Sequence, residues 1–463
     1  MRILVLLSVL LPVAAAAQDN LVFIDQIGLE NEALIDQVGS GNQLGLDTDV
    51  ALQEGYYNSL IVTQTGADNQ VGTIGRGFEQ SGNSQTPTIF NQVDITQDSN
   101  SNLVGEVLQT ATGAIPSGAN RLFILQGQSG SGDGNQIITV IQEQLDGMPG
   151  QIAQVEQTGT ENTLLRVEQR SETAAQFAEN IIRARFTGSY NGRGQLTGPA
   201  LLSRALDNAL IQRIGYDNMG ANGNEMDLTV SGDFNRFGIF QGGRRNSVGF
   251  VTITGDTNEV GLRQDGLQND ITMSTVAGDE NRVGVGQIGT NRAWVELTAF
   301  SNRNDILGLQ EGTNDLEFYV EGTGNIASAD QNYLSGLGGS NAAEFRILGD
   351  NNFLDLLQQG QNTAVFLVEG DLNNAAPASF TGVAASDPGL TPGFFKQLGF
   401  GNDATTSITG DANLVAAVQD GDANGFTVII VGNTNQAAVA QRGNANDAWI
   451  SQNGTGNTAA IIQ

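Results

Sequence analysis

The 463-residue sequence contains no cysteine and no histidine, and its single lysine is Lys396. Without thiolate or imidazole groups, the chain cannot use a cysteine nucleophile or a Ser-His-Asp triad, and it cannot build a zinc site from His and Cys. No disulfide can stabilise the fold. Only carboxylates, hydroxyls, amides, tyrosine, arginine and one lysine remain as candidate catalytic groups.

Positive charge is also scarce. Lys and Arg together number 20 against 50 Asp and Glu, which gives a formal net charge of −30. A chain this negative repels phosphate backbones and anionic lipid surfaces, so we expect no nucleic-acid partner. Charged residues make up only 15% of the chain, and Asn, Gln, Ser, Thr and Gly supply the remaining polarity. This composition is typical of a disordered polar tract or of a repetitive β array, and periodicity decides between them.

The first residues have the pattern of an export signal. Arg2 is followed by an apolar run from Ile3 to Val13 and then by four alanines that end at Ala17. This pattern predicts a signal peptide over residues 1–17 and an exported repeat domain over residues 18–463. No later stretch reaches the roughly 18 apolar residues of a membrane-spanning helix, so we do not expect the exported chain to span a membrane.

Asparagine recurs every 11 residues near the end of the sequence. The positions are Asn402, Asn413, Asn424, Asn435, Asn446 and Asn457, and most have a glycine three residues earlier. In the middle of the chain the period doubles, and half-units that carry Gly-Asp-x-Asn alternate with half-units that carry Gln-x-Gly. Such fidelity indicates a repeat architecture.

Between the recurring Gly and Asn residues, apolar and polar side chains alternate with period two. After Asn58, for example, Leu60, Val62 and Gln64 share one parity, and after Asn446 the same parity holds Ala448 and Ile450. Period two indicates short strands joined by Gly, Asn and Asp turns. A strand pair cannot bury its apolar face alone, but stacked strand–turn–strand rungs of 22–23 residues can. The prediction is therefore an all-β fold, a β-solenoid.

In such a stack, Asn lies on Asn and Gln on Gln, which satisfies buried amides rung after rung. Glycine is needed where a turn takes a positive φ or where backbones crowd. The predicted structural ladder contains Gln26, Gly28, Asn31, Gln37, Asn42, Asn58, Gln64, Gln241, Gln264, Gln287, Gln310, Asn424, Gln441, Asn446, Gln452, Asn457 and Gln463.

The repeat is interrupted at several places, which we interpret as loops inserted at turns. They lie near residues 70–95, 110–120, 128–135, 143–152, 171–207, 331–350 and 374–396. All seven prolines after residue 17 fall within them, as expected for a residue that cannot donate to a ladder. The longest interruption, 171–207, includes a run from Ser171 to Arg185 with helical character.

The full pattern Gln-x-Gly-x-x-Asn-x-Ala-x-x-x-Gln occurs from Gln26 to Gln37, from Gln441 to Gln452 and from Gln452 to Gln463. It resembles the curlin repeat, the unit of bacterial curli fibres. The resemblance implies an extracellular amyloid subunit, secreted unfolded through an outer-membrane pore, that assembles with other curlin-type subunits and serves adhesion and biofilm matrix. The chain departs from a typical curlin in its length, its Gly-Asp-x-Asn half-units and its insertions.

Catalysis and metal binding are the chemical alternatives. Paired carboxylates can cleave glycosides, but the acids here mostly occupy turns, where Asp ordinarily caps and solvates the backbone. The Gly-Gly-x-Gly-x-Asp nonapeptide of calcium β-rolls is absent. We therefore expect no enzyme, no catalytic residue, no cofactor and no specific metal site. The pair Arg244–Arg245 is interpreted as a solvated turn, and Trp449 is predicted to face outward because its parity is opposite to that of Ile450.

Two functions remain open. In the first, the chain is a subunit or nucleator of extracellular amyloid fibres, because the end rungs of a solenoid expose unpaired strand edges and the pattern runs intact to Gln463 with no evident cap. Head-to-tail stacking of this kind does not close and yields filaments. In the second, the chain is a monomeric cell-surface adhesin that binds glycans or surfaces through its inserted loops.

Overall fold

A computed structural model of the chain describes residues 19–72, 77–82, 91–111, 120–128, 130–144, 150–171, 180–205, 212–214, 223–243, 246–266, 269–298, 301–331, 340–376 and 378–463. The predicted signal peptide, the pair Arg244–Arg245 and residues 112–119 of the predicted interruption at 110–120 lie outside these residues. Strands make up 54% of the described residues and helices 3%. The chain divides into two units: Met1–Gln195 with Leu206–Asn246, and Leu196–Ala205 with Ser247–Gln463.

Unit 1 contains two series of strands that the chain visits alternately. One sheet comprises β1 (Leu21–Val22), β2 (Ile24–Leu29), β4 (Gln43–Leu44), β5 (Ala51–Tyr56), β7 (Gln70–Val71), β8 (Phe78–Gly82), β10 (Leu103–Ala111), β12 (Gln136–Gln144), β14 (Thr163–Ser171) and β16 (Gln212–Ile214). The second series comprises β3 (Glu32–Ser40), β6 (Ser59–Ala67), β9 (Asn91–Asp98), β11 (Asn120–Gln126), β13 (Gln151–Gln157), β15 (Asn180–Phe186) and β17 (Glu225–Ser231). The short β18 (Arg236–Phe237) completes the unit.

Unit 2 repeats this plan. One series comprises β19 (Ser247–Thr254), β21 (Asp270–Ala277), β23 (Arg292–Leu297), β24 (Asn314–Glu317) and β26 (Asn341–Glu344), followed by the sheet of β28 (Val368–Glu369), β30 (Asp403–Thr409), β32 (Gly425–Val431) and β34 (Asp447–Asn453). The other comprises β20 (Glu259–Val260) and β22 (Arg282–Val283), then β25 (Ile326–Ala327), β27 (Phe353–Gln359), β29 (Phe394–Leu398), β31 (Leu414–Asp420), β33 (Gln436–Arg442) and β35 (Thr458–Ile462).

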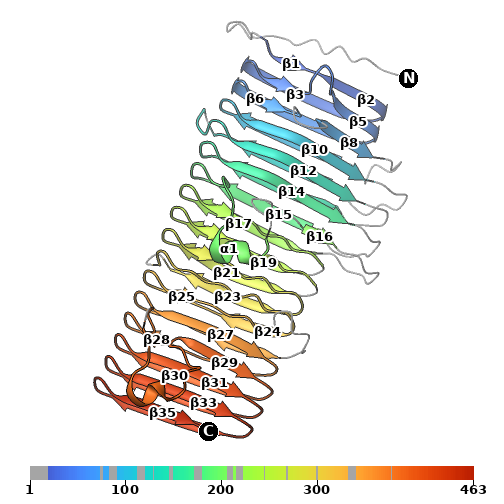
Figure 1. Cartoon of the computed structure of the whole chain (residues 1–463). Coiled ribbons are helices and arrows are strands. Elements are labelled where there is room, and N and C mark those ends of the chain that lie inside the picture. The colour runs from blue at the N-terminus through green and yellow to red at the C-terminus, as the bar shows by residue number, and fades with distance from the viewer. Residues whose placement is uncertain are drawn as a thin grey trace. The chain divides into compact units, whose positions relative to one another are not determined.

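Neighbouring strands in each series pair in parallel and in register. Gln37 lies opposite Gln64 between β3 and β6, and Gln419 lies opposite Gln441 between β31 and β33. The stacked arrows of β10, β12 and β14 in unit 1, and of β29, β31 and β33 in unit 2, show this arrangement (Figure 1). Each full coil of the chain, with strands from both series, is thus one rung. The predicted all-β solenoid is confirmed.

The interior of each unit is filled by the parity that the sequence predicted. Leu60, Val62 and Gln64 are buried, as are Ala448 and Ile450, whereas Trp449 is 68% exposed as predicted. In unit 2 one interior column is aromatic: Phe318, Phe345, Phe366 and Phe395 follow one another with ring centroids 4.1–5.3 Å apart.

Several interruptions are shorter than the sequence suggested. Strand β8 lies within 70–95, β15 lies within 171–207 and β26 lies within 331–350, each paired in the stack. The expected helical character from Ser171 to Arg185 is wrong for the described part, because Ser171 ends β14 and Asn180–Phe186 form β15. There, the gain from stacking Ile182 on Ala153 outweighs the local helical preference.

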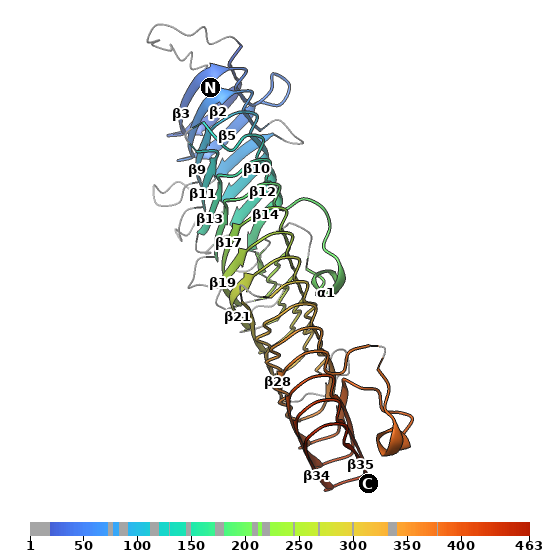
Figure 2. The same cartoon turned by 90° about the vertical axis from the view of Figure 1, so that its left-hand side faces the viewer.

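Two inserted segments fold back onto unit 2. The first contains helix α1 (Gly198–Leu202), which contacts β22 and is visible beside the strands of the unit (Figure 2). Glu259 accepts hydrogen bonds from the backbone N–H and the hydroxyl of Thr197, at 2.6 and 2.8 Å. The second contains the 3-10 helix η1 (Gly382–Ser386), which contacts β33 and β35. Pro199 lies in the first and Pro388 and Pro392 lie beside the second, outside the rungs as predicted.

Candidate assembly site: amide ladders and terminal strands

Asparagine side chains form a column at each of the two turns of a rung. At the first turn, the column of unit 2 ends with Asn402, Asn424 and Asn446. At the second turn, it contains Asn258, Asn281, Asn304, Asn325, Asn352, Asn373, Asn413, Asn435 and Asn457. In both columns, from Asn281 and from Asn402 onward, the backbone N–H of each asparagine donates to the side-chain oxygen of the asparagine in the preceding rung, at 2.8–3.2 Å.

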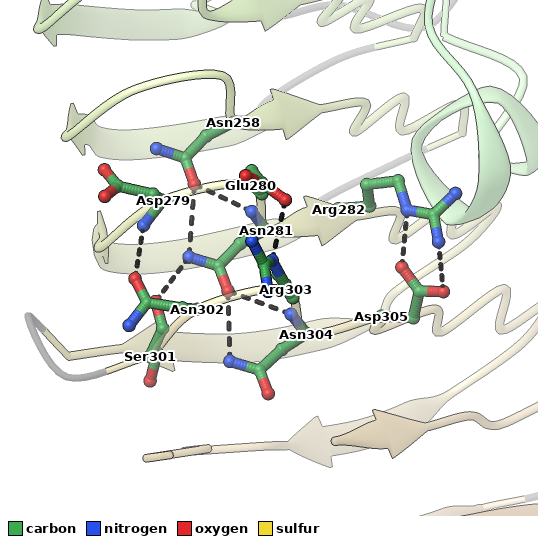
Figure 3. A network of polar contacts seen from close by, with 10 residues as sticks. All are labelled: Asn258, Asp279, Glu280, Asn281, Arg282, Ser301, Asn302, Arg303, Asn304 and Asp305. Atoms are coloured by element: carbon green, nitrogen blue, oxygen red, sulfur yellow. Dashed lines mark hydrogen bonds and ion pairs between the residues drawn. The ribbon is translucent and has the colours of Figure 1, made fainter. Parts of the chain in front are cut away.

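One rung shows how completely these amides are satisfied (Figure 3). The Nδ2 group of Asn281 donates to Asn258 Oδ1 at 3.1 Å and to the Ser301 carbonyl at 2.7 Å. Its Oδ1 accepts from the backbone N–H and the Nδ2 group of Asn304. The side chain is fully buried. A buried amide is favourable only when its partners are in place, so this network fixes the register of the rungs.

Glutamines form further columns inside the rungs. In unit 1, Gln26 donates to Gln53 at 2.6 Å and Gln37 donates to Gln64 at 2.7 Å, and both columns continue through later rungs. In unit 2, Gln264, Gln287 and Gln310 form one column, and Gln397, Gln419, Gln441 and Gln463 form another. Gln241 is buried and donates to the Glu225 carbonyl at 2.7 Å.

Glycines that precede the asparagines stack where no side chain fits. Gly28 has φ +121°, and a Cβ there would overlap the carbonyl of Gly55 in the next rung. The residue just before most of the ladder asparagines also has a positive φ, as at Glu30 and Glu280. The Gly-x-x-Asn pattern is therefore the sequence of a tight turn with two positive φ angles.

A second, exposed column of acids lies at the outer edge of the second turn. Asp350, Asp371 and Asp411 follow one another, and each Oδ1 accepts the backbone N–H of the residue one rung earlier, at 2.7–3.0 Å. These carboxylates cap turns. No group of three or more acidic side chains in a metal-binding arrangement occurs among the described residues.

Several carboxyls on the strands have pKa values shifted by their surroundings. Burial raises the pKa of Glu317, and the neighbouring carboxylates of Glu344 and Asp315 raise it further. Glu344 lies directly opposite Glu317 in the next rung. Burial also raises the pKa of Asp94, Asp227 and Asp265. Stacking in register therefore places like charges close together at the cost of repulsion.

Terminal strands complete the site. Strands β34 and β35 end their sheets, and within the described part of the chain no strand pairs with their outer edges. The same holds for the outer edges of β1, β2 and β3 in unit 1. Asn446 and Asn457 accept no ladder hydrogen bond in the described structure, although both donate to the rung before. Unpaired strand edges of this kind are templates for pairing with another chain.

The terminal rung contains one exception to the expected ladder. Gln452 lies opposite Ile430 rather than opposite another glutamine. Its Nε2 group donates to the Gln436 carbonyl at 3.0 Å, and its Oε1 atom is buried without a hydrogen-bond partner in the described structure. Within the chain itself, Gln452 therefore belongs to no glutamine column, contrary to the sequence-based expectation.

Sequence reasoning missed many ladder members, including Asn20, Gln53, Gln97 and Gln126. Their ladder bonds span 22, 27, 29 or 33 residues instead of a constant number. Loops inserted at a turn change the spacing along the chain without changing the register of the rungs. The recurring Asn-x-x-x-x-x-Gln spacing, which survives the insertions from β3 to β11 in the second series of unit 1, would have been the better guide.

The fold is thus that of an all-β solenoid held by amide ladders. The curlin associated repeat model matches residues 17–47, the segment that contains β1 to β4. The chain therefore carries a curlin repeat in its first rungs, as the resemblance indicated. None of the curated proteins matches the chain. The curlin repeat is typical of structural, extracellular proteins. No helix in the described residues is long and apolar enough to cross a membrane.

Proposed function

We propose that this chain is a curli-type structural protein that assembles into extracellular amyloid fibres, end to end, through the unpaired edges of its terminal strands. The observation that supports this most directly is the stack of in-register parallel rungs with amide ladders, in which β34 and β35 have no strand paired at their outer edges among the described residues. The curlin repeat at residues 17–47 supports the same interpretation. Adhesion, biofilm matrix and passage through an outer-membrane pore with other curlin-type subunits belong to this proposal.

The backbone of the terminal strands shows which groups would join two copies. The carbonyl of Asn446 and the N–H of Gly454 pair with β32. Because alternate residues of a strand direct their N–H and C=O groups to opposite neighbours, Trp449 and Ser451 direct theirs to the open edge. Added strands would gain a full set of backbone hydrogen bonds there.

The test uses protein without residues 1–17, diluted from denaturant and followed by electron microscopy and fibre diffraction. We expect unbranched filaments with a meridional spacing of about 4.8 Å. Ser451→Pro removes only an edge N–H and places its ring in solvent, so it is expected to abolish elongation while leaving the monomer folded. Ser451→Thr is the matched control and is expected to elongate normally.

A stable β-rich monomer would overturn the proposal. Equal filament growth by Ser451→Pro would overturn the role of this edge. The monomer result would favour the alternative of a surface adhesin, in which the inserted segments bind glycans or other surfaces. Whether the chain acts as a major subunit or as a nucleator is then measured by its ability to seed elongation of a second curlin-type protein.

A further inference from the structure

The position of Gln452 is unusual in its own column. The residues stacked beneath it are Val368, Ile408 and Ile430, all apolar and buried. The column changes to glutamine only in the terminal rung. A glutamine placed on isoleucine finds no glutamine in the rung below: its Oε1 atom has no partner there, and its Nε2 group donates only to the Gln436 carbonyl in the described structure. A glutamine on its other side would give the Nε2 group a second acceptor.

The first rung of unit 1 supplies such glutamines in both of its halves. Asn20, Gln26, Asn31 and Gln37 are separated by 6, 5 and 6 residues, and Asn446, Gln452, Asn457 and Gln463 have the same spacing. Gly28 and Gly454 also occupy equivalent positions between their Gln and Asn neighbours. The two rungs therefore carry the same four amides in the same order.

The polarity of the ladders is complementary as well. The side-chain oxygens of Asn446 and Asn457 accept no ladder hydrogen bond in the described structure. In every described asparagine ladder, the backbone N–H of the following rung donates to this oxygen. Gln441 donates forward to Gln463, as Gln26 and Gln37 donate forward to Gln53 and Gln64. A first rung placed on the terminal rung would thus accept from Gln452 and Gln463 and donate to Asn446 and Asn457.

The order of the strands decides how the two rungs meet. Along a solenoid, the strand that covers β34 precedes the strand that covers β35. The first strands of an incoming copy, β1 and β2, must therefore cover β34, and β3 must cover β35. If β1 and β2 covered β35 instead, the edge of β34 would remain unpaired beside a gap one strand wide.

We infer that successive copies of this chain join in one register, the half-rung junction, in which the first-rung half that starts at Asn20 stacks on Asn446 and the half that starts at Asn31 stacks on Asn457. The near-identity of the 11-residue half-units permits this junction. The inference rests on the proposed fibre function and assigns its partner surface and register.

Disulfide mapping tests the register, because the chain has no cysteine of its own. In the half-rung junction, Asp25 lies opposite Ser451 and Asp36 lies opposite Ile462. In the opposite junction, with β1 and β2 over β35 and β3 over β34, Asp25 would lie opposite Ile462 and Asp36 opposite Ser451. Directly opposed residues of neighbouring strands meet the Cα separation of a disulfide. The four double-cysteine variants that combine Asp25→Cys or Asp36→Cys with Ser451→Cys or Ile462→Cys form a crossed set.

Filaments of each variant, grown under reducing conditions and then oxidised, are analysed on denaturing gels without reductant. We expect a series of disulfide-linked multimers for the 25/451 and 36/462 pairs. For the other two pairs, we expect only the background amount of cross-linking seen with single-cysteine chains. Disulfide-linked multimers from the opposite pairs, or no multimers from any of the four variants, would overturn the half-rung junction while leaving fibre formation intact. Absence of filaments from the cysteine-free chain would instead overturn the proposed function and the junction with it.

A second variant separates the fold from the junction. Gln452→Ile continues the apolar column of Ile408 and Ile430 and removes the unpartnered buried oxygen. We expect it to fold as stably as the original chain or more so, yet to elongate several-fold more slowly, because Gln26 of the incoming copy loses its partner. Asparagine is too short to replace Gln452 as a control. Gln452→Glu at low pH, where the carboxyl is neutral and can donate a hydrogen bond, is expected to restore the elongation that Gln452→Ile loses. Unchanged elongation by Gln452→Ile would contradict the junction.

Discussion

A buried asparagine ordinarily lowers stability, because its amide gives up water on entering the interior. In this protein the cost is offset by repetition: each ladder asparagine finds the same donors and acceptors in the rung before and the rung after. The outer turn residues achieve the same with less burial, since Asn302 accepts the backbone N–H of Asp279 at 2.8 Å while remaining exposed. Burial, not residue type, should therefore decide which asparagines matter most.

The first prediction compares these two asparagines. Asn281→Ala leaves the backbone N–H of Asn304 and one of its two Nδ2 hydrogens without an acceptor in the interior, while the other still donates to the Gly322 carbonyl. We therefore expect local destabilisation by about 2–4 kcal/mol. Asn302→Ala removes an exposed acceptor, and we expect a cost below about 1 kcal/mol. Hydrogen exchange of the rungs around residues 258–304 measures both. Equal effects would show that the interior ladder does not fix the rungs.

Backbone crowding gives a second prediction. Gly421 has φ +128°, and a Cβ there would lie 2.7 Å from the carbonyl carbon of Gly443 in the next rung. We expect Gly421→Ala to destabilise the adjoining rungs by at least about 3 kcal/mol. Gly249→Ala is the control, because no atom lies within 4 Å of its Cβ position, and its stability should be unchanged or slightly higher. Thermal unfolding of the two variants decides, and similar melting curves would contradict the crowding argument.

At the scale of elements, strands and turns could be predicted from the sequence because both follow local rules. Period two identified Leu60 and Val62 as interior residues, and Gly-x-x-Asn identified the turns. The segment around η1 could not be predicted in this way. Thr381 and Gln436 exchange two hydrogen bonds over 55 residues, and no periodicity records such a contact. Strand β15 was missed for a different reason: Phe186 lies opposite Gln157, where the earlier rungs of the series have glutamine, so the repeat signal is absent from this strand.

The segment around η1 is attached to the terminal rungs by a small number of contacts. Ala384 and Leu390 pack against Ala416, Ala438 and Ala440, where the small outward side chains of the strands leave room for them. Asp387 accepts from the N–H of Gly389 at 2.9 Å and from Arg442 at 2.5 Å. The Gly389 hydrogen bond, and after it the one from Arg442, lower the pKa of Asp387 below its ordinary value.

The third prediction follows from this pKa. A carboxyl with a lowered pKa stabilises the folded attachment above its ordinary pKa near 4, and the contribution is lost as the pH falls through the lowered value. Hydrogen exchange of residues 378–393 should therefore increase below about pH 4. Asp387→Asn should show the increase already at pH 7, by an amount that corresponds to about 1 kcal/mol or less, because Arg442 is half exposed. Asp447→Asn, an exposed carboxyl of β34, is the control and should change nothing in this segment.

On the scale of the whole molecule, the net charge of −30 opposes the association that the terminal strands favour. Each junction brings two strongly negative chains together, and parallel stacking aligns their exposed carboxylates. The repulsion acts over distances comparable to the screening length, about 10 Å at 0.1 M salt, so it should act mainly on the rate at which copies meet. The hydrogen bonds and packing of the junction, by contrast, are short-range and should be much less sensitive to salt.

The last prediction therefore concerns the kinetics of assembly. We expect elongation to be several-fold faster at about 150 mM NaCl than at about 10 mM, and faster again as the pH falls from 7 towards 5. Acid contributes twice. It lowers the negative charge, and it relieves carboxyls such as Glu317, whose raised pKa means that the fold gains stability as the pH falls towards the ordinary value near 4. Glu317→Gln should weaken the pH dependence and leave the salt dependence in place. Calcium chloride at matched ionic strength separates screening from binding, because a rate above that in NaCl would require a bound cation. Elongation that is insensitive to both salt and pH would show that charge does not limit the meeting of copies, and that the rate is set by ordering the terminal strands themselves.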